Sequence, residues 1–271
     1  MTNTKSAENL ADTREIRHMD KLVLRAPTMA SPMRWLNAGY NEVLRHPVYS
    51  LGYGFVFTAG GLLMMYTLFK LGWAALIPAA AGGFIMMAPL LAIGLYGISR
   101  RDEEGKPLDL SVIFPRRFAE PRQLAYVALA LTLAFIVWMQ VALLLFALFS
   151  NGHSLALQDF TSYVFSTKAG LTMASIGTIV GLIIALFVFS VSALSIPILL
   201  EHHVDAITAI SASIRMVLQH PGPMLVWAWL IALYTAFGLV TGTIGLIFVF
   251  PMMGHATWHA YREMVGPVEE D

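Results

Sequence analysis

Long stretches without a charged side chain constrain this chain more than any other feature of its sequence. No Asp, Glu, Lys or Arg occurs within residues 51–69, 73–98, 124–149, 171–200 or 224–250. A helix needs about 20 apolar residues to cross the hydrocarbon core of a bilayer. Only 13% of the chain is charged, against about 25% in a soluble domain, which leaves too little polar surface to face water. The sequence therefore predicts an all-α polytopic membrane protein.

Six transmembrane helices in three hairpins are predicted. The six apolar segments are residues 51–69, 73–98, 124–149, 170–200, 224–240 and 246–261. Residues 33–46 and 204–220 place apolar side chains at helical spacing among polar ones, which is typical of amphipathic helices on a membrane surface. Residues 150–168 are predicted to be a polar loop. Residues 1–30 are predicted to be a disordered cytoplasmic tail, and residues 31–271 a single six-helix membrane domain.

Positive charge lies almost entirely on one side of the predicted membrane. Fifteen of the seventeen Lys and Arg residues fall before the first span, in the loop of residues 100–122, or at Arg215 and Arg262. Only Lys70 and Lys168 fall on the other side. Because Lys and Arg concentrate in cytoplasmic loops, both termini are predicted to lie in the cytoplasm, and the protein in the inner membrane of a bacterium.

Two segments that match at a constant offset predict an internal repeat. Val43–Pro47 reads V-L-R-H-P, and Val217–Pro221 reads V-L-Q-H-P 174 positions later. Each precedes a hairpin whose second helix contains a proline, Pro89 or Pro251. We interpret these as repeated units of one surface helix and one hairpin. The predicted units are residues 31–100, 101–201 and 202–262. The alternative is that any amphipathic helix before a span produces such spacing.

Histidines and carboxylates at the cytoplasmic ends of the later spans form the candidate site. His255 and His259 are four residues apart and therefore project from one face of a helix, which suits two ligands of a metal or of haem iron. Glu201, His202 and Asp205 lie on the same side and are predicted to complete a metal site if the helices are neighbours. In the alternative interpretation Asp205 caps the next helix, and the histidines are interfacial residues.

Other classes of site lack their characteristic residues. The span interiors contain no Asp, Glu, Lys or Arg, which argues against a proton-coupled transporter. The segment H-A-T-W-H at residues 255–259 lacks the glutamate of a zinc protease, and no enzyme activity is expected. G-x-x-x-G segments at 177–181 and 238–242 indicate close helix packing. The lipid bilayer is the expected partner and nucleic acid is not, while the oligomeric state is open.

Several motifs resemble one bacterial family of integral membrane proteins. They are S-I-P-I-L-L-E-H-H-V-D-A-I-T-A-I from Ser195, H-P-G-P-M-L-V-W-A from His220, G-L-I-F-V-F-P-M-M-G-H-A-T-W-H-A-Y-R-E from Gly245, and the N-terminal W-L-N-A-G-Y and V-L-R-H-P. With these motifs the chain resembles the family classed as domain of unknown function 2189. Some of its members are labelled cytochrome c oxidase subunit I, which has more spans and more intramembrane histidine ligands than this chain. The resemblance implies a six-span inner-membrane protein without an established activity.

Three functions follow as hypotheses. The first is a non-enzymatic scaffold or accessory factor associated with respiratory complexes, which rests on the uncharged spans and on the family resemblance. The second is a metal- or haem-binding membrane protein that uses His255 and His259, whereas the other two hypotheses need no cofactor. The third is a passive channel or small-molecule permease whose path is lined by the helices rich in small residues.

Overall fold

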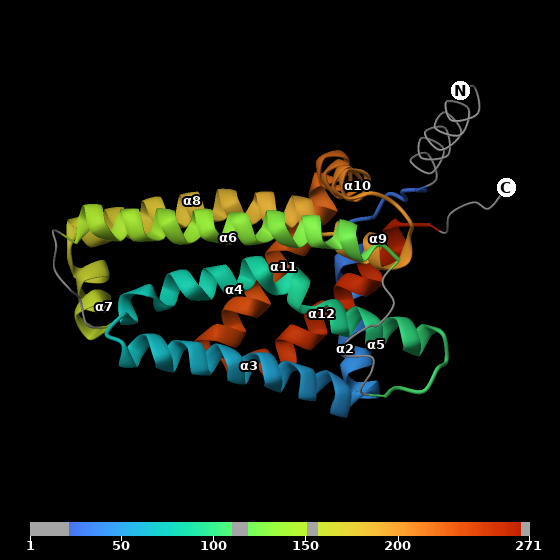
Figure 1. Cartoon of the computed structure of the whole chain (residues 1–271), viewed down its shortest axis with the longest axis horizontal. Coiled ribbons are helices and arrows are strands. Elements are labelled where there is room, and N and C mark those ends of the chain that lie inside the picture. The colour runs from blue at the N-terminus through green and yellow to red at the C-terminus, as the bar shows by residue number, and fades with distance from the viewer. Residues whose placement is uncertain (1–21, 110–118, 151–156, 267–271) are drawn as a thin grey trace, which may run out of the picture.

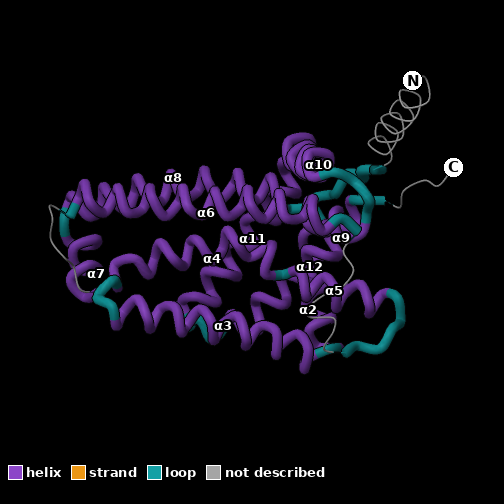
Figure 2. The backbone as a smooth tube through the Cα atoms, in the orientation of Figure 1, coloured by secondary structure: helices purple, strands orange, loops and turns teal. Residues whose placement is uncertain are grey.

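The protein is elongated, and its longest helices run along its longest axis (Figure 1). The computed structural model describes residues 22–109, 119–150 and 157–266. Within these ranges every regular element is a helix, and the sole β-type pairing is an isolated bridge between Leu24 and Val265. The predicted all-α class is confirmed. Figure 2 shows how little of the described chain lies in loops.

Five helical segments are long and apolar enough to cross a membrane. They are α3 (Pro47–Lys70), Ala74–Glu103 with α4 (Ile77–Leu91) and α5 (Ile93–Glu103), α6 (Pro121–Phe149), Lys168–Glu201 with α8 (Lys168–Ser192) and α9 (Ser195–Glu201), and α11 (Pro221–Val240). They coincide with the first five predicted spans. The predicted sixth span corresponds to α12 (Leu246–Met264), which does not reach the same hydropathy. The crossing by α12 therefore stays a prediction.

Two predicted continuous spans are broken in the structure. The second span bends at Ala92, between α4 and α5, three residues after Pro89. The fourth is interrupted at Ala193 and Leu194, shortly before Pro197 in α9. Proline lacks the N–H that a helix interior needs, and its ring clashes with the preceding turn. This accounts for the interruption just before Pro197, whereas the bend at Ala92 follows Pro89, which lies inside α4.

The predicted surface helices are α2 (Ser31–Arg45) and α10 (Ala206–Gln219). Both end at a histidine that precedes a proline, and the two histidines share one backbone conformation. His46 has φ −125° and ψ 56°, and His220 has φ −126° and ψ 58°. In each case the proline then starts a membrane helix, where its missing N–H costs nothing.

Helix α2 does not simply lie on the surface, because one of its faces packs deeply against α12. Gly39 makes this approach possible, since a Cβ at that position would lie 2.5 Å from the carbonyl oxygen of Met252. Gly54 on α3 does the same against Ile247 of α12, at 2.1 Å. Helix α12 is thus held between α2 and α3 by backbone contacts that a larger side chain would prevent.

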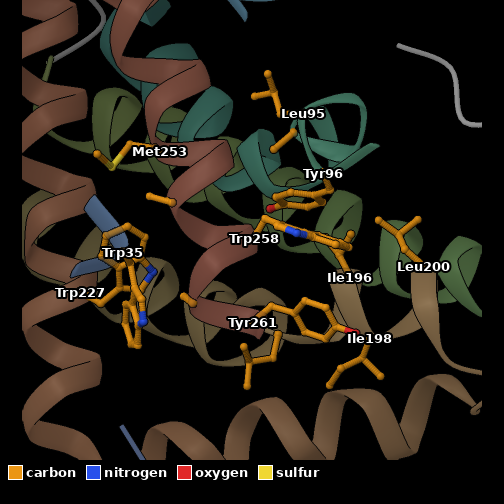
Figure 3. Close-up of a cluster of buried hydrophobic side chains, with 14 of the residues drawn as sticks. Trp35, Leu95, Tyr96, Ile196, Ile198, Leu200, Trp227, Met253, Trp258 and Tyr261 are labelled. Atoms are coloured by element: carbon orange, nitrogen blue, oxygen red, sulfur yellow. The ribbon is translucent and has the colours of Figure 1, made fainter. Parts of the chain in front are cut away.

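The core surrounds α12 at the end of the bundle that contains α2. Figure 3 shows Trp258 of α12 beside Tyr96 of α5, with ring centroids 6.3 Å apart. Trp35 of α2 meets Trp227 of α11 edge to face at 5.6 Å. These large rings are almost fully buried, and such pairs add to the stabilisation from burial. The apolar core therefore joins segments from both ends of the chain.

The connections differ in part from the prediction. Residues 150–168 were expected to be a loop, but they contain α7 (Leu157–Ser166). Residues 22–30 of the predicted tail are described, and their bridge to Val265 is flanked by a hydrogen bond from the Arg25 N–H to the Met264 carbonyl, at 2.8 Å. Residues 1–21 lie outside the described ranges, and so do residues 110–118 in the loop between the second and third spans.

Candidate functional site

A buried carboxylate on α2 is the most unusual polar group in the fold. Trp35, Gly39 and Glu42 follow one another at helical spacing, so the three residues share one face of α2. That face packs against α12, and Glu42 is 1% exposed. An isolated ionised carboxylate is very costly to bury. The contacts of Glu42 therefore decide what this part of the molecule can do.

The two histidines singled out from the sequence both contact Glu42. One oxygen, Oε2, lies 2.8 Å from Nε2 of His259. The other oxygen, Oε1, lies 3.0 Å from Nδ1 of His255, but the two atoms are not aligned for a hydrogen bond. Helix α12 supplies both imidazoles from one face, as the spacing of four residues predicts.

Two serines complete this group of side chains, which we name the Glu42 cluster: Glu42, Ser50, Ser99, His255 and His259. The hydroxyl of Ser99 on α5 lies 2.8 Å from Nδ1 of His255, and the hydroxyl of Ser50 on α3 lies 3.0 Å from Nε2. His255, Ser50 and Ser99 are all 1% exposed or less. Four helices, α2, α3, α5 and α12, therefore converge on this cluster.

The environment of Glu42 favours its ionised form. Burial alone would raise the pKa of Glu42, but pairing with His255 and His259 outweighs burial and holds the pKa well below its usual range. The hydroxyl of Ser99 acts in the same direction. A carboxylate only accepts hydrogen bonds, so the Nε2 atom of His259 that faces it must carry a proton.

Residues close to the cluster in the sequence form ion pairs of their own. Asp102 of α5 binds both Arg45 and His46, with its Oδ1 2.7 Å from Nε2 of His46. Glu103 pairs with Arg262 at 3.1 Å. These groups are partly exposed.

The other predicted metal ligands make separate contacts. Glu201 pairs with Arg100 at 3.0 Å. Nε2 of His202 lies 2.9 Å from the hydroxyl of Tyr261, and burial, followed by the charges of Arg262 and His203, lowers the pKa of His202. None of these contacts joins Glu201 or His202 to the Glu42 cluster.

Asp205 occupies the N-terminus of α10. Its side chain accepts the backbone N–H of Thr208 at 2.8 Å, as the capping interpretation expected. Hydrogen bonds from Thr208 outweigh partial burial and lower the pKa of Asp205. Across the described ranges no three His, Asp or Glu side chains are arranged to hold a metal ion. Metal or haem binding by the five proposed residues stays a prediction.

Sequence reasoning missed Glu42 because residues 33–46 were interpreted as a surface helix, on which charged side chains face water. The buried face of α2 includes Trp35, Leu36, Gly39, Glu42 and Val43, while the apolar Met33 and Leu44 remain exposed. The inward face is therefore not the one that the apolar side chains alone indicate. A signal was present in the matched segment, where the residue 174 positions after Glu42 is the apolar Met216, which indicates an inward position.

A second feature is an apolar cavity of about 430 Å³ between α4, α8, α11 and α12. Its walls include Val188, Trp227 and Val249, which are almost fully buried. They also include Leu182 and Trp229, which are 59% and 67% exposed on the outer face of the bundle. The cavity therefore begins at the surface that faces lipid. Cavities of this size and character bind small apolar molecules.

Comparison with known proteins adds one family. Residues 76–201 match the family described as predicted integral membrane protein (DUF2189). The match covers α4 to α9 and confirms the resemblance over these residues, although most of the motifs that suggested it lie outside them. No curated protein and no solved structure matches the chain. Neither the family description nor these comparisons names an activity.

Proposed function

We propose that the chain is a six-span protein of the bacterial inner membrane that binds a lipid-like apolar molecule in the cavity between α4, α8, α11 and α12. The cavity is the observation that carries the proposal. It has few polar groups on its walls, and its outer rim consists of side chains that face the acyl chains of a bilayer. A molecule that dissolves in the membrane reaches such a site without crossing water.

The small size of many wall residues favours this role. Several small residues line the cavity and leave space that larger side chains would fill. They are Ala92, Ala185, Ala193, Ala228 and Gly254. Two of these residues, Ala92 and Ala193, lie at the breaks in the second and fourth spans. Broken helices at a cavity are typical of membrane proteins that bind small molecules. The proposal therefore refines the hypothesis of a small-molecule permease.

The proposed topology places both termini in the cytoplasm. The bridge between Leu24 and Val265 holds the two ends of the described chain together, at the end of the bundle where α2, α5 and α10 lie (Figure 1). Lys70 and Lys168 lie at the turns of the other end. An even number of crossings, with α12 as the sixth, is needed for this arrangement.

The chain contains no cysteine, which makes the topology easy to test. Lys106→Cys and Lys168→Cys place single thiols at exposed positions near opposite ends of the bundle. In intact cells a membrane-impermeant maleimide is expected to label Lys168→Cys and to reach Lys106→Cys only after the inner membrane is opened. Labelling of both positions from the same side would contradict six crossings.

An internal duplication is part of the same proposal. The shared backbone at His46 and His220 and the inward-facing stripes of α2 and α10 support a relation between two of the three predicted units, residues 31–100 and 202–262. Helix α2 packs on α12, the last helix of the unit 202–262, and α10 packs on α8 and α9, the last helices of the unit 101–201. The scaffold, respiratory and metal- or haem-binding hypotheses stay predictions, since no observation in the structure favours one of them.

Ligand binding is tested with a fatty acid that carries a diazirine. After photolysis of the purified protein, adducts are expected on peptides of α8 and α11 that line the cavity. Ala228→Trp fills the cavity and should reduce these adducts severalfold. Leu148→Trp changes an exposed residue of α6 outside the cavity and should leave them unchanged. Adducts spread evenly over all the helices in the parent protein would overturn the proposal.

A further inference from the structure

We propose that the ligand of the cavity between α4, α8, α11 and α12 is an uncharged lipid whose head carries one hydroxyl, and that the O–H of Tyr96 donates a hydrogen bond to that head. The inference rests on the proposed function, because it names the class of molecule that the same cavity takes. The size of the cavity and its opening to lipid support a lipid-like ligand, whereas the polar groups on its walls decide which head that ligand can have.

The walls of the cavity supply no charge. None of the described residues that line it is Asp, Glu, Lys, Arg or His. A charged group that leaves water is very costly to bury unless an opposite charge pairs with it. A phosphate, an ammonium or an ionised carboxylate inside the cavity would lack such a partner. The head of the ligand must therefore be uncharged, and a fatty acid would enter in its protonated form.

One hydroxyl on the wall lacks a hydrogen-bond partner. Tyr96 of α5 lines the cavity and is 2% exposed. Its ring packs on that of Trp258, but within the described ranges its hydroxyl forms no hydrogen bond. Figure 3 shows the hydroxyl pointing toward the side on which Met253 and Trp227 lie, and both of these residues also line the cavity. The hydroxyl is therefore available to a ligand.

A second buried tyrosine, Tyr53, shows what such a hydroxyl ordinarily does. The Tyr53 hydroxyl donates to the Leu91 carbonyl at 2.6 Å and accepts the backbone N–H of Gly94 at 3.3 Å. A buried hydroxyl without a partner is destabilising, because it has lost its hydrogen bonds to water. An oxygen atom of a bound ligand would supply the acceptor that Tyr96 lacks.

Two further hydroxyls on the wall are placed to accept a hydrogen bond. Ser192 donates to the Val188 carbonyl, and Thr257 donates to the Met253 carbonyl, each at 2.8 Å. Their protons are therefore engaged, while each oxygen can still accept. Together with the Tyr96 donor, the wall offers both kinds of group. A ligand hydroxyl matches this set because it accepts one hydrogen bond and donates another, whereas an ether or a ketone only accepts.

The three hydroxyls lie toward the end of the bundle that contains α2. Tyr96 follows the break at Ala92 by one helical turn, and Ser192 directly precedes the break at Ala193. Thr257 lies within the last turns of α12. Figure 1 shows α5, α9 and the C-terminal end of α12 at this end of the bundle. The head of the ligand is therefore expected beside the breaks in the second and fourth spans.

The rest of the wall suits an acyl chain. Away from these hydroxyls the cavity is lined by apolar side chains such as Phe84 and Leu246, with Thr235 as the remaining hydroxyl. Leu182 of α8 and Trp229 of α11 are largely exposed at the rim. A chain attached to the head can therefore leave between α8 and α11 into the bilayer.

Two photoreactive probes of equal chain length separate a hydroxyl head from one that only accepts. One is a long-chain alcohol with a diazirine in its chain, and the other is the methyl ether of that alcohol. The purified full chain is reconstituted in phosphatidylcholine vesicles, and adducts on peptides of α8 and α11 are measured after photolysis. The alcohol is expected to give about fivefold more adducts than the ether, the factor that corresponds to one hydrogen bond of ordinary net strength.

A variant at Tyr96 tests the donor itself. Tyr96→Phe removes the O–H and retains the ring that packs on Trp258, so it should lower the adducts of the alcohol about fivefold. Thr257→Val removes one acceptor, retains the shape of the side chain and should act in the same direction. Tyr126→Phe is the matched control, because Tyr126 is 61% exposed on α6 and lies outside the cavity. It should leave the adducts unchanged.

The melting temperature without probe shows whether Tyr96→Phe folds. Because the Tyr96 hydroxyl has no partner to lose, the variant should melt at the temperature of the parent protein. A marked fall would show that the hydroxyl is bonded within the protein and would overturn the inference. Equal labelling by the two probes, or labelling of Tyr96→Phe by the alcohol at the parent level, would overturn it too, while cavity adducts would leave the proposed function standing. No cavity adducts with either probe would overturn both.

Discussion

Helices α2 and α10 have similar local sequences but different roles in the structure. Each is a short amphipathic helix that stops at His-Pro and leads into a membrane span. The inward face of α10 contains Ala209, Ala212 and Met216 and is wholly apolar apart from Ser213. The inward face of α2 contains Trp35 and Glu42 in corresponding places. The comparison shows that one buried acidic residue can make a helix part of a polar site, provided that the facing helix supplies hydrogen-bond partners.

The strongest test of that lesson transfers the carboxylate to α10. Met216 is 1% exposed and corresponds to Glu42, but the helices that α10 packs against, α6, α8, α9 and α11, contain no histidine. Met216→Glu should therefore destabilise the protein by about 3–5 kcal/mol, the range observed when a buried charge lacks its partner. Thermal unfolding in detergent micelles measures the loss. Ser211→Glu, on the exposed side of α10, serves as the control and should change stability little. Equal effects would show that α10 is not packed as described.

The next test separates α2 from α12. Gly39→Val inserts side-chain atoms where a Cβ already lies 2.5 Å from a carbonyl oxygen, and the cost should be about 3 kcal/mol, the upper part of the range for overpacking. Gly52→Val is the control, since nothing lies within 4 Å of a Cβ at that position. Thermal unfolding of both variants gives the comparison. A stable Gly39→Val protein would contradict the close contact between these helices.

Replacing Glu42 with Met makes α2 resemble α10. The imidazole of His259 then loses its acceptor, and the protein should be destabilised by about 1–3 kcal/mol near neutral pH. Because the fold lowers the pKa of Glu42 from its ordinary 4.5, the carboxylate stabilises the parent protein above that value, and this contribution is lost as the pH falls further. The difference in melting temperature between parent and variant should therefore be constant above about pH 5 and shrink as the pH falls below that value. A constant difference would show that ionisation of Glu42 does not stabilise the fold.

The smallest effect concerns the start of α10. Asp205→Ala removes the cap and should cost about 1 kcal/mol, whereas Asp205→Ser keeps a capping oxygen and should retain most of the stability. The fold lowers the pKa of Asp205, so its contribution is present above the ordinary value and disappears as the pH falls through the lowered one. Melting temperatures of both variants against pH check this. Helix α2 has no side-chain cap, so no such loss is expected there.

The sequence predicted the crossing segments well because burial in lipid depends on length and on the absence of charge, which are local properties. The five long apolar helices illustrate this. It also predicted that His255 and His259 share a face, because helical spacing alone determines that relation. The capping role of Asp205 was foreseen as an alternative for the same reason.

The contacts between distant helices could not be derived in this way. Glu42 and His259 are 217 positions apart, and no sequence pattern joins them. The fit also depends on Gly39, whose role appears only when α12 lies beside it. Similarly, Glu201 and His202 were predicted to lie near His255, but Arg100 and Tyr261 contact them instead. Tertiary packing, rather than spacing along the chain, decides which polar groups meet.

Because α2 packs against α12, the fold around α2 can be completed only after α12 has been synthesised. Helix α2 leaves the ribosome long before α12, so Trp35 and Glu42 lack their partners while the five long apolar segments between the two helices are synthesised. During that interval the face of α2 that is buried in the finished protein is uncovered. The mature packing therefore forms only when α12 enters between α2 and α3.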